Sequence, residues 1–245
     1  MKDIAAFQPQ KRTSLLESAV LKLFTRKAKV MNVEDVGTAF RIITLGGNAL
    51  RDIRWAPGDK IQMLLGGWVQ RTYTPIEWDV ESGCTRIMVH LHSGGPGEQW
   101  ARNVRTGDEC DIFGPRASLD VSRANGETIV FGDETSIGLI RAISAQPSVR
   151  SVRSLLEVTS ISDSRAALAS LDLRDVELFQ RLDNDLHLEA VQQRLLLLSA
   201  SGGTSILTGK MSSIQRLRRA LKASGVSSRK ILTKPYWALG RTGLD

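Results

Sequence analysis

The chain has 245 residues, of which 42% are hydrophobic and 24% charged, and this composition is typical of an ordinary soluble protein with one large or two moderate domains. No run approaches the roughly 20 apolar residues that span a bilayer, and the start MKDIAAFQPQKR lacks an apolar signal core, so we expect a cytoplasmic protein without membrane insertion. Cys84 and Cys110 lack metal-ligand spacing, and with three histidines in all we expect no metal site.

The net charge of +7 is unevenly distributed along the chain. Nine Lys or Arg and the single acid Asp245 give residues 208–245 a charge of +8, so residues 1–207 sum to −1. A basic segment raises the local concentration of anions. Nucleic acid is not the expected partner, because only Tyr236 and Trp237 could stack on bases there. A small anionic substrate, a phosphate cofactor or a solvated helix face would each explain the charge.

The predicted elements begin with an amphipathic helix over residues 11–26, where apolar residues recur at helical spacing. Beyond it, recurring turn signals bound six strands. These strands are predicted at residues 28–36, 39–47, 59–67, 70–78, 84–92 and 108–116. One helix, residues 97–105, interrupts the series. The regular cadence predicts an antiparallel barrel.

After Asp120 the pattern changes to strands that alternate with helices. Strands are predicted at 127–135, 152–160, 204–210 and 228–237, helices at 136–144, 162–171 and 211–225, and an apolar run of unassigned type lies at 194–199. Such alternation predicts a doubly wound parallel sheet. The predicted fold class is therefore a β-barrel plus α/β, with an antiparallel barrel at residues 1–122 and an α/β domain at residues 123–245.

The stretch WVQRTYTPIEWD, residues 68–79, is the most informative. On a strand, Arg71 and Tyr73 point to one face and Thr74 to the other, while Pro75 removes the next amide donor. A cation, a flat ring and a hydroxyl so close together could grip a group that is both aromatic and anionic. The alternative interpretation is an exposed edge strand with a solvated arginine.

A second stretch, HSGGPGEQW at residues 92–100, leads three glycines and a proline directly into a helix. Backbone amides at a helix N-terminus favour a phosphate. We therefore expect Arg71 to neutralise a pyrophosphate held at residues 95–97, while Tyr73 lies flat on a ring attached to it. Glu98 suits the helix dipole but repels a close phosphate, so we expect its side chain to point away.

Arg71-Thr-Tyr73-Thr74 followed by this turn resembles the flavin-binding barrel of the ferredoxin reductase superfamily. It is more closely similar to the siderophore-interacting protein family, the flavin-dependent ferric-siderophore reductases. The motifs that carry this resemblance continue, in order, with His92-Ser-Gly-Gly95-Pro96 and Trp100, Gly107-Asp108, Gly114-Pro115-Arg116-Ala-Ser118, Gly132-Asp133-Glu134-Thr135, and Tyr236-Trp237-Ala-Leu-Gly240. The resemblance covers nearly the whole chain.

The resemblance implies a flavin-binding barrel with FAD as cofactor, and an NAD(P)H-binding-like second domain with NADPH or NADH as electron donor. Arg71 would contact the FAD pyrophosphate, Tyr73 would pack on the isoalloxazine, and Thr74 would act in catalysis near its N5. The other implied candidates for cofactor contacts are His90, His92, Gly94, Gly95, Pro96, Gly97, Trp100, Ser118, Asp133, Glu134, Thr135 and Trp237. The candidates for contacts with an anionic substrate are Lys210, Lys234 and Arg241.

Some of these candidates have ordinary structural interpretations. His90 and His92 could be barrel residues without a ligand, and Trp100 could anchor its helix to the barrel. Asp133 and Glu134 could cap the following helix.

Three positions depart from the family pattern. Many relatives carry an arginine where this chain has Ile76, and a phosphate-binding hydroxyl where it has Glu98. Relatives often have Gly-Glu where this chain has Gly209-Lys210, beside the expected nicotinamide site. These departures affect the prediction of the electron donor more than the prediction of the flavin cofactor.

The resemblance implies that the chain reduces a ferric siderophore or similar iron(III) chelate with electrons from NAD(P)H through FAD, and releases iron(II). One alternative keeps the fold but changes the acceptor to free flavin, a quinone or an electron-transfer protein, and a ferredoxin is a candidate partner. Another alternative is a siderophore-binding flavoprotein without catalytic activity.

Overall fold

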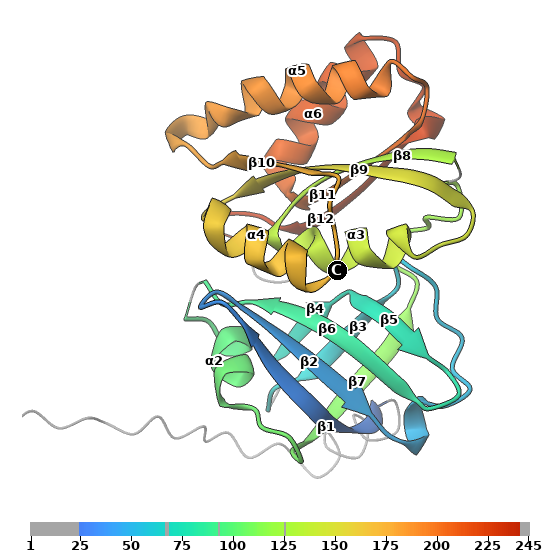
Figure 1. Ribbon diagram of the computed structural model, residues 1–245, viewed down its shortest axis with the longest axis vertical. Helices are drawn as coiled ribbons and strands as arrows, with labels where there is room; N and C mark the ends of the chain where they lie inside the picture. The colour runs from blue at the N-terminus through green and yellow to red at the C-terminus, as the bar shows by residue number, and fades with distance from the viewer. Residues whose placement is uncertain (1–24, 67–68, 93, 125, 241–245) are drawn as a thin grey trace, which may run out of the picture.

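Two sheets organise the chain, an antiparallel one in its first half and a parallel one in its second half (Figure 1). The computed structural model describes residues 25–240, apart from residues 67, 68, 93 and 125. This arrangement confirms the predicted fold class. The predicted domain boundary, between residues 122 and 123, lies in the segment that connects the two sheets.

The first sheet is a curled antiparallel sheet with the strand order β4-β3-β7-β1-β2-β6-β5. Its strands are β1 (Thr25–Val36), β2 (Phe40–Gly46), β3 (Lys60–Leu64), β4 (Gln70–Tyr73), β5 (Pro75–Asp79), β6 (Cys84–His90) and β7 (Glu109–Arg116). The two ends of this order, β4 and β5, are joined in sequence by Thr74 alone. The sheet must therefore curl until its two edges meet, and this makes it a barrel.

Two predicted elements of the barrel are wrong in part. The single strand predicted at 70–78 is two strands, because Pro75 has no amide to continue the ladder and the chain changes partner from β3 to β6 there. Most of the helix predicted at 11–26 lies outside the described residues. Its last two residues instead begin β1, where Thr25 pairs with Phe113 and tertiary pairing overrides the helical pattern.

The second sheet is parallel and has the strand order β10-β9-β8-β11-β12. Its elements are β8 (Gly126–Asp133), α3 (Ile137–Ser144), β9 (Val149–Val158), α4 (Ile161–Ser170), β10 (Val176–Gln180), α5 (His187–Ser199), β11 (Thr204–Lys210), α6 (Met211–Ala223) and β12 (Ile231–Trp237). The order reverses between β8 and β11, and open α/β sheets bind ligands at the carboxyl ends of the strands at such a point. Among the described residues, no helix is long and apolar enough to cross a membrane.

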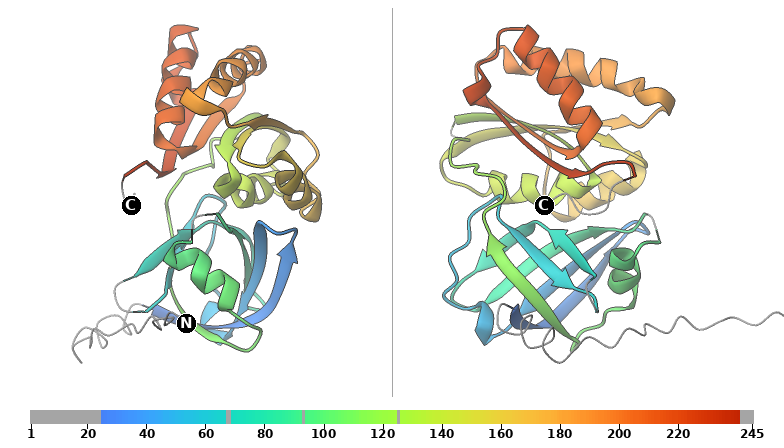
Figure 2. Two further views of the ribbon diagram at one scale, coloured as in Figure 1. Left: turned by 90° about the vertical axis from the view of Figure 1, so that its left-hand side faces the viewer. Right: turned by 180° about the vertical axis from the view of Figure 1, so that it is seen from behind.

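Short elements complete the chain. Helix α2 (Pro96–Asn103) stands beside the barrel (Figure 2), and four 3-10 helices are η1 (Asn48–Leu50), η2 (Glu134–Ser136), η3 (Asp183–Asp185) and η4 (Ser228–Lys230). The sequence did not predict β10, and the unassigned run at 194–199 belongs to α5. Helices α3 and α4 cover the sheet face toward the barrel, and α5 and α6 cover the other face (Figure 1).

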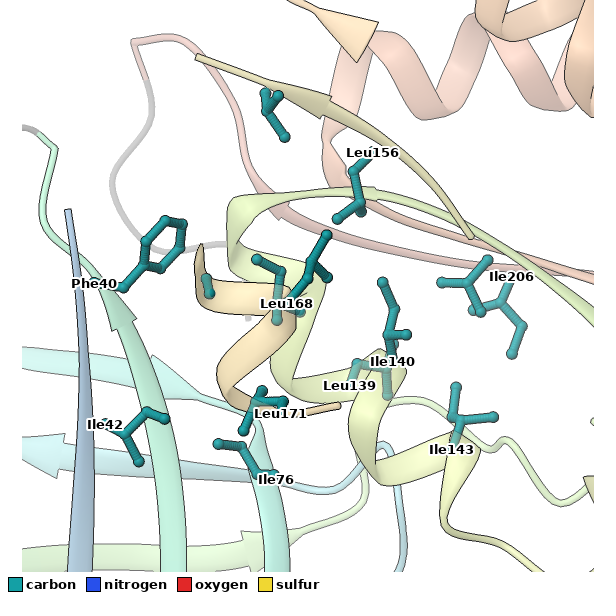
Figure 3. Close-up of a cluster of buried hydrophobic side chains, with 14 of the residues drawn as sticks. Phe40, Ile42, Ile76, Leu139, Ile140, Ile143, Leu156, Leu168, Leu171 and Ile206 are labelled. Atoms are coloured by element: carbon teal, nitrogen blue, oxygen red, sulfur yellow. The ribbon is translucent and has the colours of Figure 1, made fainter. Parts of the chain in front are cut away.

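One hydrophobic cluster spans the boundary between the two sheets (Figure 3). Ile42 and Ile76 enter it from the barrel, while Leu139, Ile140 and Ile143 enter it from α3. Burial of each such side chain contributes about 1.5–3 kcal/mol. The shared cluster therefore holds the closing edge of the barrel against the second sheet, and this places the candidate site between them.

Candidate functional site

The barrel contributes Arg71 and Tyr73, which lie together on β4 against the first turn of α2. A Cβ atom added at Gly97 would lie 3.0 Å from Arg71 Cγ and 3.0 Å from Tyr73 Oη. The glycine therefore lets the helix approach the strand closely. The prediction that Arg71 and Tyr73 share one face is confirmed.

The glycine-rich turn presents backbone amides at the start of α2. Gly95 is the N-cap residue and offers no side chain to the first-turn amides, while Pro96 begins the helix. Gly94 has a φ of 65°, a left-handed conformation that suits glycine. These amides and the helix dipole favour a phosphate group.

Glu98 departs from its prediction, because its side chain does not point away from the turn. One carboxylate oxygen accepts a hydrogen bond from the amide of Gly94 at 2.6 Å. The other accepts from Arg102 Nε at 2.8 Å, and the Glu98 side chain is only 10% exposed. A carboxylate of the chain itself therefore occupies one amide of the turn.

Tyr73 offers a neutral, flat surface beside Arg71. Burial raises the pKa of Tyr73 far above its ordinary value, although the charge of Arg71 acts in the opposite direction. The centroids of the Tyr73 and Trp100 rings are 6.2 Å apart, and the rings are tilted by 39°. Trp100 also packs on the barrel core, and this favours its interpretation as the anchor of α2.

Thr74 lies where the barrel closes and where the second sheet approaches it. Its Oγ1 atom donates a long hydrogen bond of 3.5 Å to the hydroxyl oxygen of Tyr236, near the end of β12. Burial raises the pKa of Tyr236 to about 12. The strand that carries the candidate cofactor residues and the last strand of the parallel sheet therefore share one site.

Asp133 ends β8 and is completely buried. Its carboxylate accepts hydrogen bonds from the Thr135 amide at 2.9 Å and from Trp237 Nε1 at 2.7 Å. Burial, aided by the charge of Glu134, raises the pKa of Asp133 above its ordinary value, against Arg181 and the hydrogen bonds from the Thr135 hydroxyl and Trp237. Gly209 has a φ of +92°, and a Cβ atom there would lie 2.4 Å from Asp133 Oδ2. Asp133 thus caps the turn and also holds Trp237.

Glu134, the next residue, forms a buried ion pair with Arg181, whose Nη2 lies 3.0 Å from Glu134 Oε2. The amide of Thr159 donates to the other carboxylate oxygen at 2.6 Å. Burial is the largest single influence and raises the pKa of Glu134, but the charge of Arg181, the backbone hydrogen bonds and His90 together outweigh it, so the pKa is lowered. Arg181 Cζ also lies 5.7 Å from the centre of the Trp237 ring, within the range of a cation–π contact.

Sequence reasoning missed Arg181, because the short strand β10 that precedes it was not predicted. A second missed pair holds the segment after β10 in place. His187 Nδ1 accepts from the amide of Leu182 at 3.2 Å, so its Nε2 carries the proton and donates to Glu157 at 2.8 Å. Both side chains of this pair are buried. The available signal for Arg181 was its place as a cation directly after VELFQ, residues 176–180.

His90 and His92 stack on each other, with ring centroids 4.5 Å apart and an angle of 10° between the rings. The other face of His90 stacks on Phe40 at 4.8 Å. Burial lowers the pKa of His90 to about 4, although the charges of Glu134 and Glu98 act in the opposite direction. His90 is therefore neutral at physiological pH, on the barrel side of the site.

The remaining candidates lie at varied places. Ser118 is half-buried between β7 and β8, and Thr135 is exposed. Lys210 is nearly buried, and its Nζ lies 2.7 Å from Asp185 Oδ1. Lys234 lies on β12 beside Thr208 of β11, while Arg241 lies outside the described residues. Helix α6, which carries three more arginines of the basic segment, covers the sheet face away from the barrel (Figure 1).

The fold and the site together define a class of protein. A curled antiparallel barrel with a phosphate-favouring turn, followed by a doubly wound sheet whose carboxyl ends meet it, is a fold shared with a solved ferredoxin reductase. The chain belongs to the siderophore-interacting protein family. The model of the siderophore-interacting FAD-binding domain matches residues 66–119, and the model of the siderophore-interacting protein matches residues 126–240.

Known relatives and solved structures support this assignment. The chain is 24% identical to the NADPH-dependent ferric-chelate reductase of Escherichia coli strain K12, over 86% of this chain and 92% of the relative. A siderophore-interacting protein from Aeromonas hydrophila has a similar fold, with a TM-score of 0.71, 22% identity, and coverage of 89% and 93%. A ferredoxin NADP⁺ reductase from Neisseria gonorrhoeae has a TM-score of 0.69 at 13% identity, with coverage of 87% and 99%.

FAD is the cofactor of this family's barrel, and the residues of this chain fit it. Gly97 allows Arg71 and Tyr73 to meet the helix turn, and the N-cap residue Gly95 has no side chain that could cap the first amides of α2. A cation beside bare amides suits a pyrophosphate. The flat, neutral ring of Tyr73 suits the face of a planar ring.

Proposed function

We propose that the protein reduces iron(III) bound by a siderophore or similar chelate, with NADPH as electron donor and FAD as cofactor, and that it releases iron(II). The observation that carries this proposal is the contact between Thr74 of the barrel and Tyr236 of β12. It joins the candidate cofactor strand to the carboxyl ends of the parallel sheet. The similarity to an NADPH-dependent ferric-chelate reductase along most of both chains supports the same activity.

The barrel residues bind and orient the cofactor in this proposal. Bound FAD supplies the redox chemistry, because a flavin can accept a hydride and pass on single electrons. Arg71 and the backbone amides of Gly95 and Gly97 would hold the pyrophosphate, and Tyr73 would support the isoalloxazine ring. The Thr74 hydroxyl would help to orient the isoalloxazine ring. His90, neutral and stacked on Phe40, closes the barrel side without adding a positive charge.

The second domain positions the electron donor. NADPH binds at the switch point between β8 and β11, where open parallel sheets bind nucleotides. Asp133 and Arg181 hold the Trp237 ring from two sides, so the aromatic wall of the site has a fixed orientation. No protein ligand to iron is required, since iron(II) binds hard oxygen donors more weakly than iron(III) and leaves the chelate after reduction.

The basic C-terminal segment attracts an anionic chelate in this proposal. Lys234 and Arg241 are the proposed contacts on this segment. Lys210 contributes only to a substrate that displaces Asp185 from their ion pair. Charge reversal at Lys234 and Arg241 should raise the KM for an anionic chelate and leave the FAD content unchanged. The effect of reversal should weaken at high salt, because the Debye length falls from about 10 Å at 0.1 M to about 3 Å at 1 M.

Anaerobic kinetics with the FAD-loaded protein test the function. NADPH or NADH is added first, and loss of the flavin absorbance reports transfer from the donor. A ferric siderophore is added next, and a chromogenic iron(II) chelator reports the product. We expect each hydride equivalent to reduce two iron(III) ions, since each ion takes one electron. Reduction of the flavin without formation of iron(II) would indicate another acceptor, and no flavin reduction by either nicotinamide would contradict the proposal.

A further inference from the structure

Glu98 is the one acidic side chain of the first turn of α2, and it lies inside the turn where the family's barrel holds a pyrophosphate. Its carboxylate accepts a hydrogen bond from the amide of Gly94 at 2.6 Å and forms an ion pair with Arg102 at 2.8 Å. Only 10% of the side chain is exposed. The carboxylate is thus held in this position from two sides.

Helix capping alone explains only part of this geometry. A glutamate at the third helical position commonly reaches back to the amide of the N-cap residue. Here the N-cap is Gly95, and Glu98 reaches one residue further, to the amide of Gly94. A Cβ atom at Gly94 would meet nothing within 4 Å, so the turn is open on the Cβ side of this residue.

A carboxylate and a phosphate are attracted to such a turn for the same reasons. Both accept hydrogen bonds from bare amides, and both are stabilised by the positive end of the helix dipole. The two negative charges repel each other when both are close to the turn. Arg71 lies against the same turn, beside Gly97, and is the cation that a phosphate would share with it.

We propose that Glu98 is an internal anion that competes with the pyrophosphate of FAD for the turn at residues 94–97. This inference rests on the assignment of FAD to the barrel. Glu98 stabilises the turn when the cofactor is absent and weakens the hold on the cofactor when it is present. FAD therefore dissociates more readily from this protein than it would if position 98 were uncharged.

Equilibrium titration of the apoprotein with FAD, followed by flavin fluorescence, tests the inference. Glu98→Gln removes the charge and keeps a side-chain oxygen of similar reach for the Gly94 amide. We expect it to lower the Kd for FAD roughly two- to tenfold, the range of one charge at a helix N-terminus. The difference from the wild type should shrink at high salt, because repulsion between charges is screened.

Glu81→Gln is the matched control, since it removes one acidic charge from an exposed turn of the same barrel. It should leave the Kd unchanged. If Glu98→Gln binds FAD no more tightly than the wild type, Glu98 is only a helix cap and the inference is overturned. If neither the wild type nor Glu98→Gln binds FAD, the cofactor assignment and the proposed function fail together. Thermal unfolding of each apoprotein verifies that the variants are folded.

Discussion

The two halves of the site differ in how far their polar groups are already paired. In the barrel, Arg71 donates to the backbone oxygen of Gln70 at 2.7 Å, and no described carboxylate lies within ion-pair distance of it. In the second domain, Glu134 and Arg181 are paired with each other, and Lys210 is paired with Asp185. Arg71 is therefore not paired with a described carboxylate, whereas Arg181 and Lys210 of the second domain are.

This difference assigns different roles to similar residues. A buried charge that is paired and hydrogen-bonded holds its surroundings in one arrangement, and removal of one partner leaves the other uncompensated. A cation beside unpaired amides instead contributes to ligand affinity. Substitutions in the second domain should therefore change stability, and substitutions in the barrel should change cofactor binding.

The largest expected effect follows from Arg181→Ala. The variant leaves Glu134 buried without its cation, and this should lower the free energy of unfolding by about 3 kcal/mol, the low end of the range for a broken buried pair. The affinity for FAD should change little. Denaturant unfolding of the apoprotein measures the first quantity, and flavin titration measures the second.

Arg174→Ala is the control for this experiment, because Arg174 pairs with Asp172 in the same domain but both side chains are exposed, by 85% and 78%. Its loss should cost less than about 1 kcal/mol. Equal losses for Arg181→Ala and Arg174→Ala would show that the buried pair does not hold the second domain together.

Arg71→Ala should give the opposite pattern. A charge-assisted contact to phosphate contributes about 1.5–3 kcal/mol, so the affinity for FAD should fall by that amount while the stability of the apoprotein stays close to that of the wild type. Arg86→Ala, which removes a barrel arginine paired with Glu77, serves as the control. Full flavin occupancy with unchanged affinity in Arg71→Ala would contradict the assignment.

His90 provides a test by pH. Its pKa is about 4 in the folded protein, mainly through burial, against an ordinary value of 6.5. Above pH 6.5 both folded and unfolded chains carry neutral His90, so it contributes no pH dependence. As pH falls from 6.5 to 4, the unfolded chain binds the proton first and stability falls, by on the order of 1–3 kcal/mol.

His90→Gln should remove this part of the acid sensitivity, and the difference between the two unfolding curves isolates it from other groups. Glu134 and Glu98 raise the pKa of His90, and His92 and Arg181 lower it, so these four groups are the same in the wild type and in His90→Gln. His92→Gln, which removes an exposed histidine, should keep most of the fall in stability. If the free energy of unfolding falls equally in the wild type and in His90→Gln between pH 6.5 and 4, His90 is not a neutral, buried group.

The smallest effect is expected at Tyr73. If its ring stacks on the isoalloxazine, Tyr73→Ala should loosen FAD by about 0.5–1.5 kcal/mol beyond the loss of contact area. Tyr73→Phe should be mild, because it keeps the ring and the neutral tyrosine hydroxyl adds no charge. Flavin titration compares the two variants. Equal damage from Phe and Ala would mean that the hydroxyl carries the contact.

Local patterns were sufficient to predict most of the barrel half of the site. Arg71 and Tyr73 are two residues apart, and the alternation of side chains along a strand places them on one face. The glycines before α2 predict exposed amides at a helix start, and the structure has them there. The order of these motifs also identified the family. Such features depend on neighbouring residues, so the sequence alone determines them.

The tertiary structure alone decided how the charges are paired. Arg181, directly after β10, reaches Glu134 of η2, and Lys210, at the end of β11, reaches Asp185 of η3, so sequence spacing could not reveal either pair. The division of residues 70–78 into two strands depends on barrel closure, in which β4 and β5 pair with different partners. Even Glu98, whose conflict with a phosphate was evident from sequence, took its position through backbone geometry. A charged residue has a structural role when the fold places an opposite charge beside it, and it can bind a ligand when the fold does not.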